Sequence, residues 1–239
     1  MRFLHTTYLL TLGVLLITYA ARAQRIDALG LAGSFNISQS WVREPNVQLG
    51  NYFLQTTPRR TRFDDTGNRY SVFARIQLGR GAFFAQPELA YTSTLSSKYD
   101  LSYPGDPGSP SAPTYESASS APFGYRMRRA EVAALVGRHV GKRLYVLAGP
   151  VLALQRQQSA TGQTGNAAVY RSLYQAVAPV QLLGQVGLGL QVGRLDVGLR
   201  YEHSLTPYTR QVTYQGQTQD FHQYTKQFIL SVGALLYKR

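Results

Sequence analysis

The sequence contains no cysteine, which removes several classes of chemistry and cross-linking. A disulfide framework, a thiolate metal site, a cysteine nucleophile and a lipoprotein anchor all require that residue. Charged residues make up only 15% of the chain. The apolar run near the N-terminus is shorter than the ~20 residues of a membrane-spanning helix, and no later segment supplies an unbroken run of that length. We therefore expect neither a helical membrane protein nor a fold held together by covalent links.

The N-terminal segment has the pattern of a secretory signal peptide. Arg2 precedes an apolar run from Tyr8 to Ala20, and Ala21-Arg22-Ala23 offers a small-x-small cleavage site. We expect residues 1–23 to be the signal peptide and residues 24–239 to form a single domain, because the remaining length suits one sizeable domain.

Alternation of apolar and polar side chains predicts eight β-strands. In the clearest example, Arg194 to Thr206, the apolar residues Leu195, Val197, Leu199 and Tyr201 alternate with polar residues or glycine. The strands are expected at residues 26–38, 69–78, 82–95, 125–138, 142–156, 176–192, 194–206 and 226–237. Short connections near residues 79–81, 139–141 and 193–194 alternate with long ones at 39–68, 96–124, 157–175 and 207–225. An even strand number with this alternation predicts an all-β fold, an eight-stranded antiparallel up-and-down transmembrane β-barrel.

Two of the long connections have features of their own. The second contains five of the eleven prolines, which cannot donate to a sheet ladder, so we expect an unpaired loop there. In the fourth, Thr209 to Tyr214 and Gln219 to Tyr224 flank Gly216 and could form a hairpin above the membrane.

The predicted faces of the strands differ in polarity. One face is apolar, as lipid contact requires, and comprises Leu29, Leu31, Val72, Ile76, Leu89, Val132, Val136, Val146, Leu152, Val180, Leu182, Val186, Leu188, Val197, Leu199, Leu230 and Val232. On this face an aromatic girdle is expected near the long connections, formed by Phe35, Tyr70, Tyr91, Tyr201 and Phe228. A soluble lipocalin-like barrel would reverse this polarity, so that alternative is disfavoured.

The opposite face carries polar residues, and the charged ones among them are Arg75, Glu88, Arg129, Glu131, Asp196, Arg200 and Glu202. The interior of an eight-stranded barrel is just wide enough for side chains to fill it. Because unpaired buried carboxylates are too costly, we expect these charges to pair across the lumen. A structural plug is favoured over a diffusion pore or a catalytic acid pair.

The net charge of +13 indicates an anionic partner. An exported protein seldom meets nucleic acid, so lipopolysaccharide phosphate is the expected counter-charge. Arg59, Arg60 and Arg62 form a basic cluster in the first long connection that could contact lipopolysaccharide or a partner protein. Arg126 and Arg128 could contact lipid phosphate from the start of a strand, or could be loop residues before a strand that starts later. The specific protein partner is not indicated.

A catalytic alternative comes from His203-Ser204 beside Glu202, since a histidine, a hydroxyl and a carboxylate are the parts of a nucleophilic relay. Neighbours in a strand point to opposite faces, which disfavours this relay. The histidines show no metal-ligand spacing, and we expect no metal and no cofactor.

Four segments carry motifs in a characteristic order. Phe83 to Thr92 (FFAQPELAYT) contains Pro-Glu-Leu, and Arg143 to Leu154 (RLYVLAGPVLAL) contains Gly-Pro; Gln185 to Leu205 contains GLRYEHSL, and the last segment is KQFILSVGALLYKR. These segments resemble, in turn, the PEL-containing strand, the Gly-Pro strand, the RY-containing strand pair and the final strand of the porin-family, PorT-like outer-membrane β-barrel proteins. The chain departs from the family in ending on Tyr237-Lys238-Arg239 rather than on an aromatic residue.

This resemblance implies a barrel in the cell outer membrane, inserted by the barrel-assembly machinery. One branch of the family assists protein secretion, and the sequence does not decide whether that role applies here. Our leading hypothesis is a non-enzymatic barrel that acts through its outer loops or in envelope integrity. The alternatives are an outer-membrane lipid hydrolase of the lipid A deacylase type, and a small pore or secretion accessory. Candidate contact features include the proline-rich loop and the aromatic cluster Tyr208, Tyr214, Phe221 and Tyr224.

Overall fold

A computed structural model describes residues 25–43, 46–50, 52–55, 65–79, 81–95, 99–103, 119–123, 126–156 and 167–238. The predicted signal peptide lies outside these residues. In the described part, no helix is long and apolar enough to cross a membrane.

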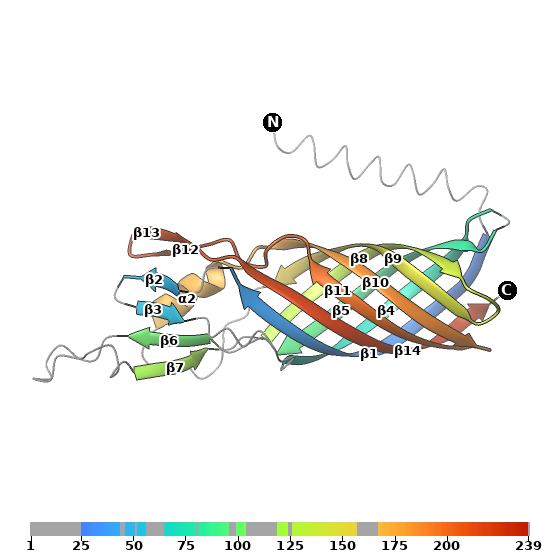
Figure 1. The fold of residues 1–239 in the computed structure, drawn as a ribbon, viewed down its shortest axis with the longest axis horizontal. Coiled ribbons are helices and arrows are strands. Elements are labelled where there is room, and N and C mark those ends of the chain that lie inside the picture. Colours follow the sequence, from blue (N-terminus) through green and yellow to red (C-terminus); the bar gives the residue numbers. More distant parts are fainter. Residues whose placement is uncertain are drawn as a thin grey trace, which may run out of the picture.

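Eight strands close into an antiparallel barrel in which neighbours in sequence are neighbours in space (Figure 1). They are β1 (Arg25–Val42), β4 (Asp65–Gln77), β5 (Phe83–Leu95), β8 (Arg126–His139), β9 (Leu144–Arg156), β10 (Val180–Val192), β11 (Leu195–Ser204) and β14 (Gln223–Lys238). The barrel closes where β1 pairs with both β14 and β4. The eight predicted strands are confirmed, with ends that differ by a few residues.

The barrel is apolar outside and charged inside, which is the polarity of a transmembrane barrel. Of the outward apolar residues predicted from the sequence, Ile76 and Val197 are half-buried and the others are exposed. Leu230 and Val232, for example, expose 54% and 53% of their surface. The girdle aromatics also face outward, and Tyr70 is 63% exposed.

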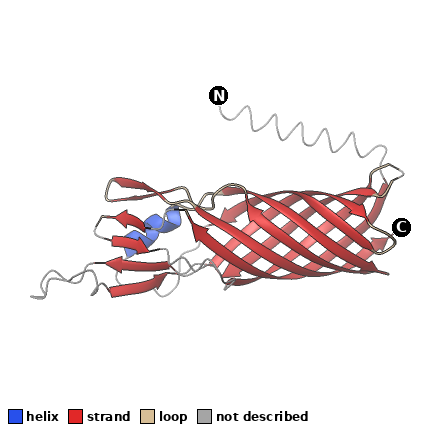
Figure 2. Ribbon diagram, viewed as in Figure 1, coloured by secondary structure: helices blue, strands red, loops and turns tan. Residues whose placement is uncertain are grey.

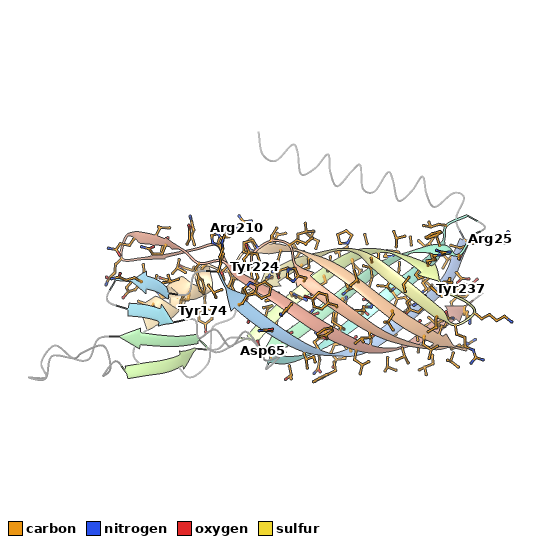
Figure 3. All side chains as sticks on the ribbon, viewed as in Figure 1. Arg25, Asp65, Tyr174, Arg210, Tyr224 and Tyr237 are labelled. Carbon is orange, nitrogen blue, oxygen red and sulfur yellow. The ribbon has the colours of Figure 1, made fainter. Side chains whose placement is uncertain are left out.

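The short connections are tight because glycines adopt backbone angles that other residues avoid. Gly79, Gly141 and Gly193 have φ values of 69°, 94° and 61°. Strand pairing places all three at the end of the barrel where β1 begins and β14 ends, since Arg25 pairs with Gln77 and Leu195 pairs with Ala234. Figure 3 labels Arg25 and Tyr237 at this end.

The long connections emerge at the other end and contain secondary structure of their own (Figure 2). A four-stranded sheet has the order β2-β3-β6-β7, built from β2 (Asn46–Leu49), β3 (Tyr52–Gln55), β6 (Tyr99–Tyr103) and β7 (Ser119–Phe123). Helix α2 (Ala167–Gln175) and the hairpin of β12 (Gln211–Tyr214) and β13 (Gln217–Asp220) complete this region, which we call the cap.

The cap confirms one expectation for the long connections and corrects another. The hairpin around Gly216 is present, with Gln215 and Gly216 at φ 49° and 78° as a type I′ turn requires. The proline-rich connection is not wholly unpaired, because β6 and β7 form a hairpin within it. Pro122 is tolerated there because β7 is the edge strand of its sheet.

Candidate functional site

The barrel interior holds a cluster of buried ion pairs. Arg69 on β4 contacts two carboxylates: its Nη1 lies 2.6 Å from Glu88 Oε1, and its Nε lies 2.9 Å from Glu131 Oε2. On β8, Arg129 Nε lies 2.5 Å from the other Glu131 oxygen, and Arg129 also pairs with Glu202 on β11. These side chains are almost completely excluded from solvent.

Further hydrogen bonds extend this cluster to neighbouring strands. Arg200 Nη1 lies 2.9 Å from Glu88 Oε2, and it donates to Gln185 Oε1 at 3.2 Å. Gln185 and Gln227 each donate to Glu202, at 3.2 and 2.7 Å. Each carboxylate therefore accepts several hydrogen bonds, which is the condition for offsetting the large desolvation penalty of buried charges.

A second group lies nearer the short turns. Arg75 Nη2 is 2.7 Å from Asp196 Oδ2, and Tyr145 donates its hydroxyl to Asp196 Oδ1 at 2.6 Å. The Arg75 guanidinium lies 4.2 Å from the centre of the Tyr145 ring, a cation–π contact. Gln86 joins the two groups, since it accepts from Arg75 Nε and donates to Glu88 Oε2 at 3.0 Å.

The structure thus brings together the seven lumen residues that the sequence indicated. It adds Arg69, which has the same strand parity as Arg75 and could have been found from that signal. With Arg69 included, the arginines at 69, 75, 129 and 200 balance the carboxylates at 88, 131, 196 and 202. Tyr145 was also missed, and its ring lies against Gly189 on the adjacent strand.

The predicted contact residues for lipid or partner are described only in part. Arg59, Arg60 and Arg62 lie outside the described residues. Arg126 and Arg128 belong to β8, so the alternative that the strand starts after them is wrong. Arg128 is half-buried and shares its strand face with the exposed Val132, while the side chain of Arg126 lies outside the described part.

The residues of the hydrolase alternative point in different directions. Ser204 is buried and bonds to Gln181 and Thr225, at 2.9 Å and 2.8 Å. His203 lies on the outer face of β11, where its ring stacks on Trp41. Glu202 takes part in the lumen cluster. This arrangement does not support a relay among the three.

The cap has a hydrophobic core of its own. It is formed by Val42, Val47, Leu49, Met127, Val169, Leu173, Ala176, Val177, Tyr208, Val212 and Phe221. Val42 and Met127 come from barrel strands, so the core ties the cap to the rim. Of the aromatic residues named as candidate contacts, Tyr208 and Phe221 are buried in this core, and Tyr214 packs against it. These three therefore stabilise the cap rather than form a contact surface.

Backbone hydrogen bonds reinforce this junction. Ala178 N donates to Tyr208 O at 2.8 Å, and Tyr208 N donates to Gln223 O at 2.6 Å. Thr209 Oγ1 accepts from Gln223 N at 3.0 Å and donates to Phe221 O at 2.5 Å. The β12–β13 hairpin is therefore fixed at its base and not attached by a loose linker.

Among the described residues, no group of three or more histidine, aspartate or glutamate side chains could hold a metal ion. A scan against models of protein families finds no match, and a search of curated protein sequences finds none either.

Searches of solved structures do find similar chains. Ail, the attachment invasion locus protein of Yersinia pestis, was solved in complex with the heparin analogue sucrose octasulfate. It is 12% identical, with 88% of this chain and 100% of that chain covered and a TM-score of 0.40. The translocator domain of the autotransporter NalP from Neisseria meningitidis is 14% identical, with 96% of each chain covered and a TM-score of 0.32. The outer-membrane protease OmpT from Escherichia coli is 7% identical, with coverage of 89% and 95% and a TM-score of 0.31. At such identities the likeness concerns the fold alone.

Proposed function

We propose that this chain is a non-enzymatic outer-membrane protein of the porin-family, PorT-like type, which presents a folded cap outside the cell. The observation that carries the proposal is the buried core of the cap, in which residues from α2, β2, β12 and the barrel rim pack together. Side chains on such a scaffold hold fixed positions, and binding residues are commonly found on loops held by a rigid sheet. Figure 1 places the cap at the end of the barrel opposite the short turns.

The lumen supports an anchoring role for the barrel. Its charged side chains are buried and paired, so they fill the cross-section at the level of Arg69, Glu88 and Glu131. A conducting pore would need these groups to be hydrated. Partners under this proposal are outer-membrane lipid and lipopolysaccharide, the barrel-assembly machinery during insertion, and a ligand of the cap, with no role for nucleic acid.

The exposed surface of the hairpin indicates what kind of contact the cap offers. Gln211, Thr213, Gln217 and Gln219 are exposed, so its side chains are mostly amides and hydroxyls. Such groups both donate and accept hydrogen bonds. A neutral, hydrogen-bonding partner surface fits this composition.

Orientation in the membrane can be tested because the chain lacks cysteine. Gln219→Cys places a thiol on the cap, and Lys142→Cys places one in a short turn. Both positions are exposed. Intact cells treated with a membrane-impermeant maleimide should label Gln219→Cys, whereas Lys142→Cys should label only after permeabilisation. The opposite pattern would overturn the proposal.

The role of the cap can be tested by replacing Gln211–Asp220 with an Asn-Gly turn. The barrel should still fold, shown by a gel mobility that changes on boiling, while the variant should fail to complement loss of the wild-type chain. Full complementation would show that the hairpin is not part of the binding surface.

The hydrolase alternative has its own test. His203→Ala should leave the lipid A profile unchanged if the proposal is correct.

A further inference from the structure

An aromatic and basic cluster lies on the outer face of the barrel where β1, β14 and β11 meet the cap. The Trp41 ring stacks on His203 and on Tyr224, with ring centres 5.4 and 5.6 Å apart. Lys226 Nζ lies 5.9 Å from the centre of the same indole ring. Tyr224 is labelled in Figure 3, at the junction of barrel and cap.

Three of these residues, Trp41, His203 and Tyr224, line a hollow at this junction of barrel and cap. It has a volume of about 410 Å³ and is lined by Trp41, Val42, Arg43, His203, Ser204 and Tyr224. Arg43 is exposed, and Lys226 stands beside the hollow next to Trp41. None of the described residues that line the hollow is acidic. The hollow therefore combines flat apolar rings with cationic side chains and is complementary to an anion that carries an apolar body.

The position of the hollow along the membrane normal narrows the type of anion. His203 lies two residues beyond the girdle residue Tyr201 on the same face of β11, and Lys226 lies two residues beyond Phe228 on β14. At ~3.3 Å per residue and a tilt of ~40°, two residues correspond to about 5 Å farther from the membrane centre. Girdle aromatics mark the level of the lipid head groups. Tyr224 and its pairing partner Trp41 lie two residues farther again, about 10 Å beyond the girdle. The hollow therefore lies just outside the girdle, where the phosphorylated sugars of an outer-leaflet glycolipid extend.

We propose that the hollow at Trp41 is a binding site for the phosphate head group of an anionic outer-leaflet glycolipid. Arg43 and Lys226 bind the phosphate, and the stacked rings of Trp41, His203 and Tyr224 contact the sugar and the start of the acyl chains. This inference rests on the proposed outward orientation of the cap, which the cysteine-labelling experiment tests separately.

Trp41 makes the site directly observable, because it is the only tryptophan in the chain. Purified full-length protein in non-ionic micelles is titrated with lipid A, and indole emission is excited where tyrosine does not absorb. We expect a saturable change in Trp41 emission. Lys226→Gln and Arg43→Gln should each weaken lipid A binding by about fivefold, since a basic residue at an anionic membrane surface contributes about 1 kcal/mol.

Matched controls remove the same charges at the other end of the barrel. Lys142→Gln and Arg143→Gln change exposed residues of a short turn and should bind lipid A like the wild type. Lipid A without its phosphates should bind as weakly as the Arg43→Gln/Lys226→Gln double variant. Gel mobility before and after boiling shows that each variant is folded.

Three outcomes would overturn the proposal. The first is a wild-type emission that does not respond to lipid A. The second is equal binding of phosphorylated and dephosphorylated lipid, which would leave only apolar contact. The third is saturation by inorganic phosphate at the concentration that suffices for lipid A, which would point to a free anion and not to a lipid.

Discussion

Removing one member of the buried ion-pair cluster should cost at least as much unfolding free energy as removing the matched pair. In Arg69→Met, Glu88 keeps Arg200 and Glu131 keeps Arg129, but the lumen is left with one excess negative charge. Glu131→Gln leaves one excess positive charge. Because breaking a buried pair from one side typically costs about 3–5 kcal/mol, each single variant should lose that much unfolding free energy.

The double variant Arg69→Met/Glu131→Gln restores the balance of charge. The remaining groups form one-to-one pairs, Arg129 with Glu202, Arg200 with Glu88, and Arg75 with Asp196. We therefore expect the double variant to be no less stable than the single variants, with a coupling energy of about 3 kcal/mol or more.

The assay is reversible denaturant unfolding in lipid vesicles, with gel mobility as the measure of folded barrel. Arg143→Met removes an exposed arginine from a turn and should change the unfolding free energy by less than about 0.5 kcal/mol. The reasoning would be refuted if the double variant lost as much unfolding free energy as the two single variants together. It would also be refuted if each single variant lost no more than Arg143→Met.

Three further variants test other parts of the molecule. Gly189→Ala places a methyl group about 2.1 Å from the Tyr145 ring and should destabilise the barrel, whereas Gly33→Ala, where a methyl meets nothing within 4 Å, should not; thermal unfolding compares them. Phe221→Ala should destabilise the cap by about 3–5 kcal/mol, because it empties part of the cap core. The cap should then become sensitive to protease, while the barrel itself stays folded and still changes its gel mobility on boiling. Val132→Lys puts a charge on the lipid-facing surface and should cost about 2–4 kcal/mol in vesicle unfolding; an unchanged midpoint would contradict the assigned face.

The barrel could be predicted from sequence because each strand carries its own information. Alternation with period two defines both the strand and its two faces, and pairing joins sequence neighbours, as in β10 and β11. The charged lumen residues followed from the same parity. Arg69 was not predicted as a lumen residue because it is the first residue of the predicted strand. In the structure β4 starts earlier, at Asp65, which pairs with Ser38 of β1.

The cap could not be predicted in the same way. Its strands β2, β3, β12 and β13 have four residues each, which is too short for a clear period. The pairing of β3 with β6 joins segments that are separated by a whole barrel hairpin. Helix α2 offers only a weak signal, with Val169 and Leu173 four residues apart on its buried side. Such non-local contacts are decided by tertiary packing and not by local pattern.

The Trp41 hollow also depends on the fold. Its residues come from the end of β1 and Arg43 just after it, the end of β11 and the start of β14, and the sequence gives no pattern that relates them. The order β1-β14-β11 places Tyr224 and Lys226 between Trp41 and His203. The histidine that suggested a catalytic relay in the sequence therefore faces outward, toward the aromatic rings.

The most direct test of a closed transmembrane barrel is membrane fractionation of the expressed protein, combined with gel mobility before and after boiling. We predict recovery in the outer-membrane fraction and a clear mobility shift, because a hydrogen-bonded closed sheet resists detergent until it is heated. Recovery as a soluble protein whose mobility does not change on boiling would contradict the lipid-facing assignment and the functional proposals that depend on it.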